Sequence, residues 1–358
     1  MCVSLAVQIE LSWDRAEQRG WLVNMATGFV DIQVNGALGV DFSSPELTIE
    51  DIARVTRFLS ERGTAAFCPT VVTGAPEMYS HCLPLIARAR RDPEIGPHLL
   101  GLHLEGPFIS PEPGAVGVHA RDFVVAPDIG EFDRLYDLAE GAVDILTLAP
   151  DQPGAVHLIS YAVSKGVRVA MGHHNANNAQ MEAALAAGAS LATHVGNGIA
   201  NMIHRHDNPL WWILAEDGLS GSFVTDGHHL PPALIKTGFR AKAASRFIVT
   251  SDASALAGVP VGEYVYAGKP VVVEESGRIF CPETSSLAGS HSTMLECMNY
   301  LASLGIMSDE DLWRVGFHNP AEFLGLDKSA LSALAISPVR LEDSVFRVDQ
   351  VFAGAARL

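Results

Sequence analysis

The chain has 358 residues, 48% hydrophobic and 18% charged, which is enough for one large domain with a substantial apolar core. Asp and Glu outnumber Lys and Arg by 41 to 24, and this acidic balance argues against nucleic acid or an anionic membrane surface as a partner. The first apolar run, residues 3–7, is too short for a signal peptide or a membrane span, and the five cysteines show no CxxC spacing. We therefore expect a cytoplasmic protein with reduced thiols.

From about residue 29 to 325, short apolar runs alternate with longer amphipathic segments, which is the pattern of βα units around a parallel sheet. The expected strands are residues 28–34, 64–72, 98–104, 143–149, 167–172, 190–193, 220–225 and 246–251. The helices expected between them include residues 48–62, 76–91, 154–165, 176–187, 209–217 and 231–244, and Thr48 with Asp51 forms a capping box at the first start. Eight such units predict an α/β fold of the closed (β/α)8 TIM-barrel type over residues 28–325.

Further elements are expected after the eighth strand. Residues 264–281 are expected to form an inserted hairpin, and helices are expected over residues 291–304, 309–315 and 320–324. Two β-like runs in the tail, residues 335–341 and 345–352, are expected to pair with the runs 5–11 and 21–25. The sequence thus predicts a small β-sandwich-like accessory domain made from residues 1–27 and 330–358.

Polar side chains follow nearly every predicted strand, and in a (β/α)8 barrel the chemistry lies at the carboxyl ends of the strands. Glu105, His173 and His194 end three different strands on one rim, and three nitrogen or oxygen ligands with an open fourth position suit a hydrolytic metal site. A metal ion lowers the pKa of its water, and Asp252 after the eighth strand is placed to accept the proton. Any one of these residues has a structural alternative, but the set favours a metal-dependent hydrolase.

Other histidines near this rim are harder to assign. His103 lies two residues before Glu105, so it points to the same side of the strand and is either a fourth ligand or a lining residue. We favour the lining role because hydrolytic zinc sites usually keep three protein ligands. His174 and His228 are expected to be structural.

The motifs, taken together and in chain order, resemble those of the N-acetylglucosamine-6-phosphate deacetylase family of the amidohydrolase superfamily. The most specific segments are residues 101–112 (GLHLEGPFISPE), 172–176 (GHHNA), 193–197 (THVGN), 226–229 (DGHH), 251–253 (SDA) and 287–289 (LAG). The likeness implies that metal-bound water removes the N-acetyl group of an amino sugar 6-phosphate. N-acetylglucosamine 6-phosphate would give glucosamine 6-phosphate and acetate.

The resemblance also implies individual roles. It implies that Glu105, His173 and His194 are the metal ligands and that Asp252 is the general acid and base. It also implies that His229 polarises the amide carbonyl of the substrate. The substrate-binding positions that it implies are Val118, Asn197, Gly198, Arg205, Asp226, His229, Leu287, Ala288 and Gly289. The implied cofactor is one divalent metal ion, zinc before iron, manganese or cobalt. The implied partners are a small-molecule amino sugar phosphate and a second copy of the chain in a homodimer.

One replacement relative to other amidohydrolases points to the single-metal branch of the family, and there are also departures from the family pattern itself, among them fewer residues before the first strand than the N-terminal sheet normally takes. Many amidohydrolases bind a second metal through His-x-His after the first strand, whereas Gln33 and Asn35 occupy these positions here and favour a single ion. Family members carry an Arg-Glu-Pro-Gly-like segment whose Arg reaches the phosphate across a dimer, and here residues 204–210 read HRHDNPL, with Arg205 at the right distance from His194. The loop over residues 112–119 is longer than usual. The alternatives are an amidohydrolase acting on another N-acyl substrate, such as an N-acyl amino acid or a different N-acetylated sugar, and a catalytically silent sugar-phosphate-binding barrel.

Overall fold

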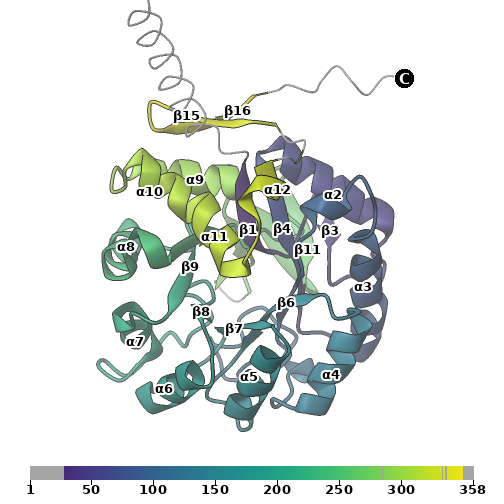
Figure 1. Cartoon of the computed structure of the whole chain (residues 1–358), viewed down its shortest axis with the longest axis vertical. Helices are drawn as coiled ribbons and strands as arrows, with labels where there is room; N and C mark the ends of the chain where they lie inside the picture. Colours follow the sequence, from purple (N-terminus) through teal and green to yellow (C-terminus); the bar gives the residue numbers. More distant parts are fainter. Residues whose placement is uncertain (1–27, 284–285, 333, 335–336, 350–358) are drawn as a thin grey trace, which may run out of the picture.

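In the computed structural model the described residues are 28–283, 286–332, 334 and 337–349. Eight strands form one sheet in which each neighbouring pair is parallel (Figure 1). In spatial order they are β1 (Phe29–Val34), β4 (Thr64–Val72), β5 (Leu102–Glu105), β6 (Val143–Leu148), β7 (Arg168–Met171), β8 (Leu191–Ala192), β9 (Ser220–Val224) and β10 (Phe247–Thr250). The end strands β1 and β10 meet through a parallel bridge between Val34 and Ala253. The predicted (β/α)8 barrel is confirmed.

Helices surround the strands as an outer ring (Figure 1). They are α2 (Ile49–Glu61), α3 (Pro76–Ala89), α4 (Ile129–Leu138), α5 (Ala155–Ser164), α6 (Asn178–Ala186), α7 (Pro209–Ala215) and α8 (Pro232–Arg246). The capping box of α2 is present, because Thr48 Oγ1 accepts from the Asp51 N–H at 3.1 Å and the Asp51 carboxylate accepts from the Thr48 N–H. Helix α4 is not among the helices expected from the sequence. Asp128 caps its N-terminus, and Phe132 and Leu135 are buried.

The expected start of the third strand is wrong by four residues. Residues Gly96–His98 form the 3₁₀ turn η1, and His98 Nδ1 donates to the Ala65 carbonyl at 2.7 Å; Leu99 forms an isolated parallel bridge with Phe67, and the continuous strand begins only at Leu102. The strand also runs one residue further than expected and ends at Glu105. A side chain that ends a parallel strand lies at the rim of the barrel.

The hairpin expected after β10 is confirmed, and it belongs to a larger sheet. Its strands are β11 (Gly262–Tyr266), β12 (Lys269–Val273), β13 (Ile279–Cys281) and β14 (Ser286–Leu287), all antiparallel to their neighbours. Six buried apolar residues form a core of its own: Leu256, Val271, Val273, Ile279, Cys281 and Ala288. His228 Nε2 donates to the Ser276 carbonyl at 2.9 Å and ties this sheet to the loop after β9, which agrees with a structural role.

The remaining elements lie outside the eight-stranded sheet. The short hairpin β2 (Gly36–Ala37) and β3 (Val40–Asp41) follows β1, and α9 (Met294–Ser303), α10 (Asp309–Trp313), the π turn η3 (Arg314–His318), α11 (Asn319–Leu324) and α12 (Lys328–Ser332) follow the inserted sheet. In the tail, β15 (Val339–Glu342) pairs with β16 (Val345–Val348). The runs 5–11 and 21–25 lie outside the described residues, so their pairing with the tail stays a prediction.

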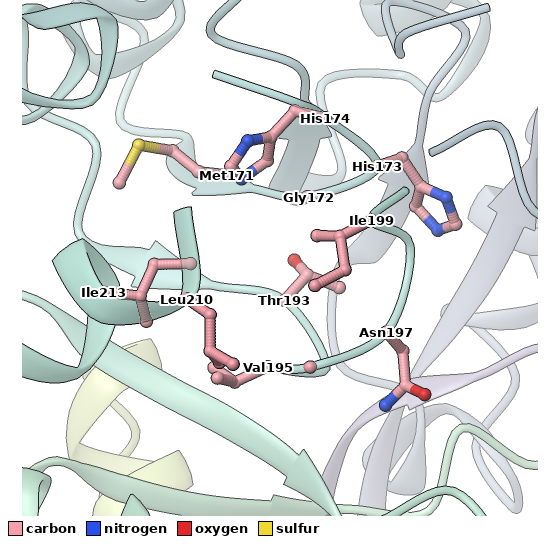
Figure 2. A pocket seen from close by; sticks show the side chains of 11 residues that line it. Met171, Gly172, His173, His174, Thr193, Val195, Asn197, Ile199, Leu210 and Ile213 are labelled. Atoms are coloured by element: carbon pink, nitrogen blue, oxygen red, sulfur yellow. The ribbon is translucent and has the colours of Figure 1, made fainter. Parts of the chain in front are cut away.

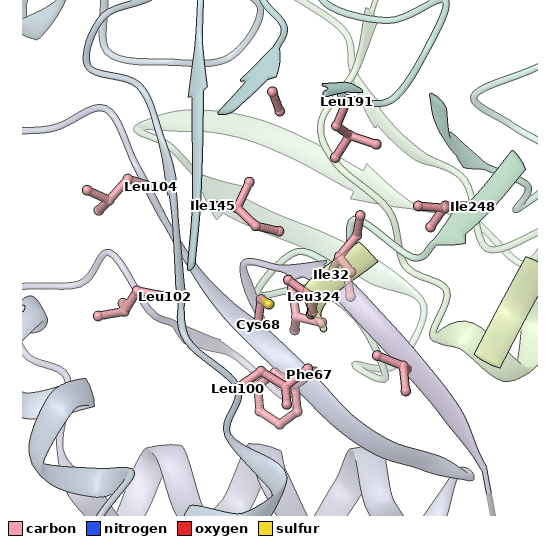
Figure 3. Packing of buried hydrophobic residues seen from close by; sticks show 14 of the residues in the cluster. Ile32, Phe67, Cys68, Leu100, Leu102, Leu104, Ile145, Leu191, Ile248 and Leu324 are labelled. Atoms are coloured by element: carbon pink, nitrogen blue, oxygen red, sulfur yellow. The ribbon is translucent and has the colours of Figure 1, made fainter. Parts of the chain in front are cut away.

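An aromatic cluster joins the tail hairpin to the barrel, and buried apolar side chains lie on the barrel strands. Phe346 of β16 packs edge-on against Phe29 and Trp313, with ring centroids 5.2 and 5.1 Å away, at the end where β1 begins. Ile32, Ile145, Leu191 and Ile248 are buried residues of different barrel strands (Figure 3). Within the described part of the chain, no helix has the length and apolar character needed to cross a membrane.

Candidate metal-dependent active site

The three predicted ligands meet at the carboxyl ends of β5, β7 and β8. Oε1 of Glu105 lies 3.0 Å from Nε2 of His173 and 2.9 Å from Nε2 of His194, and the two imidazole nitrogens are 3.0 Å apart. All three side chains are buried. His173 and His194 have positive φ angles of 54° and 31°, a backbone conformation that residues with a side chain rarely adopt and that concentrates at functional sites.

The surroundings of the ligands fit a divalent ion. His173 Nδ1 donates to the Ala115 carbonyl at 2.8 Å, which leaves the Nε2 lone pair for a cation. Nδ1 of His194 is buried and has no hydrogen-bond partner among the described residues. Gly198 lies against both rings, since a Cβ there would come within 3.0 Å of His173 Nδ1 and 3.1 Å of His194 Cε1. Two imidazoles and one carboxylate are ligands typical of a catalytic zinc site.

The electrostatics of the cluster agree with this fit. Burial opposes ionisation of Glu105, but hydrogen bonds and charge from His173 and His194 outweigh it and hold the pKa of Glu105 well below its usual value. Among the described residues, this is the one group of three or more potential ligand side chains that converge closely enough to bind a metal ion. The geometry therefore gives a possible metal-binding triad of Glu105, His173 and His194.

His103 lies beside the cluster but turns both ring nitrogens elsewhere. Nδ1 donates to the Ile32 carbonyl at 3.1 Å, and Nε2 accepts from Thr147 Oγ1 at 2.7 Å. Burial lowers the pKa of His103 to about 4, so the ring is neutral at pH 7. The geometry agrees with the lining role and leaves no lone pair of His103 for a metal ion.

His174 points away from His173, as its place in the sequence predicts (Figure 2). It lines a small cavity of about 10 Å³, the size of one water molecule, together with Met171, Val195 and Ile213. Burial lowers the pKa of His174 to about 3. A neutral, buried imidazole directed into an apolar cavity fits the expected structural role.

Asp252, the predicted general base, is held by two amides from β1 and the residue after it. Its Oδ1 accepts from Gln33 Nε2 at 3.0 Å and from Asn35 Nδ2 at 2.8 Å. The same nitrogen of Gln33 lies 3.0 Å from Oε1 of Glu105. Burial and the charge of Glu105 raise the pKa of Asp252 to about 6, which suits proton transfer near neutral pH.

His229 is bound to Asp226 in a buried pair. Its Nδ1 lies 2.7 Å from Oδ2 of Asp226, while Oδ1 of Asp226 accepts from the backbone N–H groups of His228 and His229, both at 2.9 Å. Burial opposes ionisation of Asp226, but the hydrogen bond from His229 outweighs it and holds the pKa of Asp226 at about 2. The carboxylate in turn raises the pKa of His229 against the effect of burial. Asp226 thus orients His229 and favours its protonated form.

The positions implied for substrate binding are distributed around this centre. Asn197 Nδ2 donates to the His194 carbonyl at 3.2 Å, next to Gly198. Val118 is exposed on the loop after β5. Leu287 ends β14 of the inserted sheet, and Ala288 and Gly289 follow it. Arg205 lies on an exposed loop, and its carbonyl accepts from Trp211 Nε1. Their contacts with a substrate stay predictions.

Sequence reasoning missed one histidine of the site. His119 is buried, and its Nε2 lies 3.2 Å from Nε2 of His173. Its Nδ1 accepts from the Thr73 N–H at 3.3 Å, so Nε2 carries the proton of the neutral ring. Burial and the charge of His173 lower the pKa of His119 to about 3. The available signal was its place directly after Val118, a position already implied to contact the sugar.

The chain was compared with known proteins. No protein-family model matches it. It is 31% identical over 303 residues to the N-acetylglucosamine-6-phosphate deacetylase of Bacillus subtilis, which covers 84% of this chain and 75% of that protein. The enzyme of the same name from Homo sapiens is 33% identical over 320 residues and matches 85% of this chain and 75% of its own.

Solved structures give the same result. The N-acetyl-D-glucosamine-6-phosphate deacetylase of Mycobacterium smegmatis superposes with a TM-score of 0.80 at 29% identity, covering 90% of this chain and 84% of that one. A variant of that enzyme, solved in complex with N-acetyl-D-glucosamine-6-phosphate, also superposes with a TM-score of 0.80 and is 28% identical, covering 89% of this chain and 83% of its own. The chain belongs to the N-acetylglucosamine-6-phosphate deacetylase family.

Proposed function

We propose that the protein is a metal-dependent deacetylase that converts N-acetylglucosamine 6-phosphate and water into glucosamine 6-phosphate and acetate. The observation that carries the proposal is the buried set of Glu105, His173 and His194 with Asp252 beside it, in a chain that belongs to this family. A variant of the related Mycobacterium smegmatis enzyme was solved with that sugar phosphate bound.

Glu105, His173 and His194 would hold the ion, and we propose zinc because two imidazoles and a carboxylate are its usual catalytic ligands. When bound, the ion lowers the pKa of a water molecule and polarises the amide carbonyl. The hydrogen bond from His173 Nδ1 to the Ala115 carbonyl keeps the Nε2 lone pair directed at the ion.

Asp252 transfers the protons in this proposal. Gln33 and Asn35 both donate to Oδ1, which leaves Oδ2 to accept the proton of the attacking water and to return one to the leaving nitrogen. Burial and the charge of Glu105 raise the pKa of Asp252 to about 6, so the carboxyl group accepts and releases a proton with little cost near neutral pH.

His229 stabilises the negative charge that develops on the carbonyl oxygen. Asp226 is bonded to Nδ1 and raises the pKa of the imidazole, so Nε2 carries a proton that it can donate to that oxygen. Asp226 itself stays ionised, because its pKa is held at about 2. The pair therefore supplies a fixed hydrogen-bond donor to the carbonyl oxygen.

Arg205, Asn197 and Gly198 are proposed to bind the phosphate, with Arg205 contributed across a homodimer. Met202 is 90% exposed and Trp211 is 54% exposed beside Arg205, and exposed apolar side chains of this size support an interface. The buried thiols of Cys68, Cys82 and Cys297 support a cytoplasmic location.

The test measures acetate release by purified, metal-analysed protein. The substrates are N-acetylglucosamine 6-phosphate, unphosphorylated N-acetylglucosamine, N-acetylgalactosamine 6-phosphate and an N-acetyl amino acid. We expect about one metal ion per chain and a strong preference for the first substrate. Faster turnover of the amino acid would make the protein a different amidohydrolase, and a lack of both metal and turnover would support a silent sugar-phosphate-binding barrel.

A further inference from the structure

The barrel has one seam without an extended backbone ladder. β1 and β10 are the two end strands of the eight-stranded sheet. Among the described residues, the backbone joins them at the end of β1 and beyond the end of β10, where Val34 bridges Ala253 and the N–H groups of Asn35 and Gly36 donate to the Ala253 carbonyl at 2.8 and 3.2 Å. Asp252, the proposed proton carrier, directly precedes this junction.

A buried carboxylate crosses the seam within the strands. Asp31, in the middle of β1, is 1% exposed. Its Oδ1 accepts from Thr250 Oγ1 at 2.6 Å and from the Ser251 N–H at 3.2 Å, and its Oδ2 accepts from Ser251 Oγ. One side chain of β1 therefore binds the last residue of β10 and the residue after it. A charged acceptor makes such hydrogen bonds stronger than neutral ones.

These bonds bracket a strained residue. Asp252 has a positive φ of 49°, which costs free energy for a residue with a Cβ unless its neighbours hold it. Ser251 Oγ donates to Asp31 and also accepts from the Ala253 N–H at 3.1 Å. The backbone is thus held on both sides of Asp252. Asp31 binds Ser251 before it, and Ser251 in turn binds Ala253 after it.

Three polar side chains in and directly after β1 position Asp252. Asp31, Gln33 and Asn35 lie close together in the chain, in β1 and directly after it, and the pairing of β1 with β4 shifts register between Asp31 and Val34. Gln33 and Asn35 donate to the carboxylate of Asp252, whereas Asp31 binds the backbone and hydroxyl groups that precede it. Carboxylate and backbone of Asp252 are therefore both positioned from β1.

We propose that Asp31 is a positioning residue for catalysis, which acts through Ser251 to hold Asp252 in its left-handed backbone conformation. This inference rests on the proposed function, in which Asp252 carries the proton. Displacement of a reacting group by about 1 Å can reduce turnover about 100-fold, without weakening substrate binding to the same degree. A purely structural Asp31 would change stability and leave kcat as it is.

The experiment compares wild type with Asp31→Asn, Asp31→Ala and Ser251→Ala on N-acetylglucosamine 6-phosphate. We expect kcat to fall about 100-fold in Asp31→Ala and about 10-fold in Asp31→Asn, which keeps one acceptor oxygen, with KM within about threefold of wild type. Asn319→Ala is the matched control. Asn319 is also buried and bonds the Phe247 carbonyl at 2.7 Å, at the opposite end of β10, so its loss should lower the melting temperature and preserve kcat.

A crystal structure of Asp31→Asn gives a second measurement that does not depend on activity, and we expect the φ of Asp252 to leave the left-handed region. If wild type is active and both Asp31→Asn and Ser251→Ala keep the wild-type kcat, the positioning role is overturned. If Asp31→Ala does not fold, Ser251→Ala decides, since it keeps the bond from Thr250 to Asp31. If wild type shows no turnover, the proposed function fails, and an unchanged Asp252 backbone in the variant then overturns the positioning role separately.

Discussion

Glu105 and Asp252 share one hydrogen-bond donor, because Nε2 of Gln33 lies 3.0 Å from Oε1 of Glu105 and 3.0 Å from Oδ1 of Asp252. The charge of Glu105 contributes to raising the pKa of Asp252, so the two carboxylates repel each other. The neutral amide of Gln33 lies between them and offers an N–H group to each. The metal ligand and the proton carrier are thereby linked through one side chain.

Replacing Gln33 by Leu keeps the volume and removes this shared donor. We expect kcat to fall about 10- to 100-fold, since the loss of one hydrogen bond to a buried charged group costs about 1.5 to 3 kcal/mol. Metal content should stay near that of wild type, because the three ligands are untouched. Steady-state kinetics with elemental analysis of the same sample checks both points, and an unaltered kcat would show that the bridging amide is dispensable.

The barrel and its cluster of three candidate metal ligands were predictable because both depend on local patterns. Eight apolar runs gave the strands, and polar residues directly after them, Glu105, His173 and His194, fall on one rim in any closed parallel barrel. His119 was missed because it lies in a loop, 14 positions after Glu105, where no periodicity fixes its place. Only the folded loop brings its Nε2 within 3.2 Å of His173.

Other features depend on contacts between distant segments and had no local signal. The hydrogen bonds of Asp31 join residues 219 and 220 positions apart, and the positive φ of Asp252 follows from such contacts. The expected pairing of the tail with residues 5–11 and 21–25 also joins distant segments, and it stays a prediction because those residues lie outside the described part; β15 and β16 themselves pair with each other through a local turn at Asp343 and Ser344. Alternation marks a strand but does not specify its partner.

The activity should fall at low pH as Asp252 becomes protonated. Burial and the charge of Glu105 raise the pKa of Asp252 to about 6, and a bound cation would favour the ionised form, so we expect the acid midpoint of kcat/KM at or below pH 6. Asn35 donates to Asp252 and lowers that pKa, so Asn35→Ala should move the midpoint to higher pH. Asp252→Asn should keep the metal and lose several orders of magnitude in kcat. A midpoint that Asn35→Ala does not move would assign the acid limb to another group.

The activity should fall at high pH as His229 loses its proton. Asp226 raises the pKa of His229, so the protonated imidazole persists to higher pH than a free one, and activity is lost as the pH rises through that raised value. In Asp226→Asn the partner charge is gone, so this basic limb should shift to lower pH and kcat should drop about 100- to 1000-fold. A pH profile of kcat for both proteins measures the shift. An unmoved basic limb would contradict the pairing of charge proposed for this site.

Removal of the metal ion should abolish turnover and destabilise the fold. A ligand that binds only the folded state adds about 2.7 kcal/mol when its concentration is 100 times its dissociation constant. Dialysis against a chelator should therefore lower the melting temperature, and zinc should restore it. Glu105→Gln is the matched variant, because it keeps the shape of a ligand and removes its charge. Equal melting temperatures with and without chelator would argue against a metal at these residues.

Arg205 offers a test of phosphate recognition that is separate from catalysis. Arg205→Ala should raise KM for N-acetylglucosamine 6-phosphate about 10- to 100-fold, which is the effect of losing one charge-assisted hydrogen bond. KM for unphosphorylated N-acetylglucosamine should stay unchanged. Arg240→Ala is the control, since Arg240 is an exposed arginine on α8 and should affect neither substrate.

The same variant also tests the proposed homodimer, because Arg205 is proposed to reach the phosphate of the substrate bound in the neighbouring subunit. Mixing Arg205→Ala with inactive Asp252→Asn should restore part of the tight binding if subunits exchange, since each mixed dimer then pairs an intact Asp252 with a partner that carries Arg205. Light scattering gives the molar mass of the same samples. Restored KM in a dimer supports sharing across the interface. Equal KM effects on the phosphorylated and unphosphorylated sugars would remove Arg205 from phosphate binding altogether.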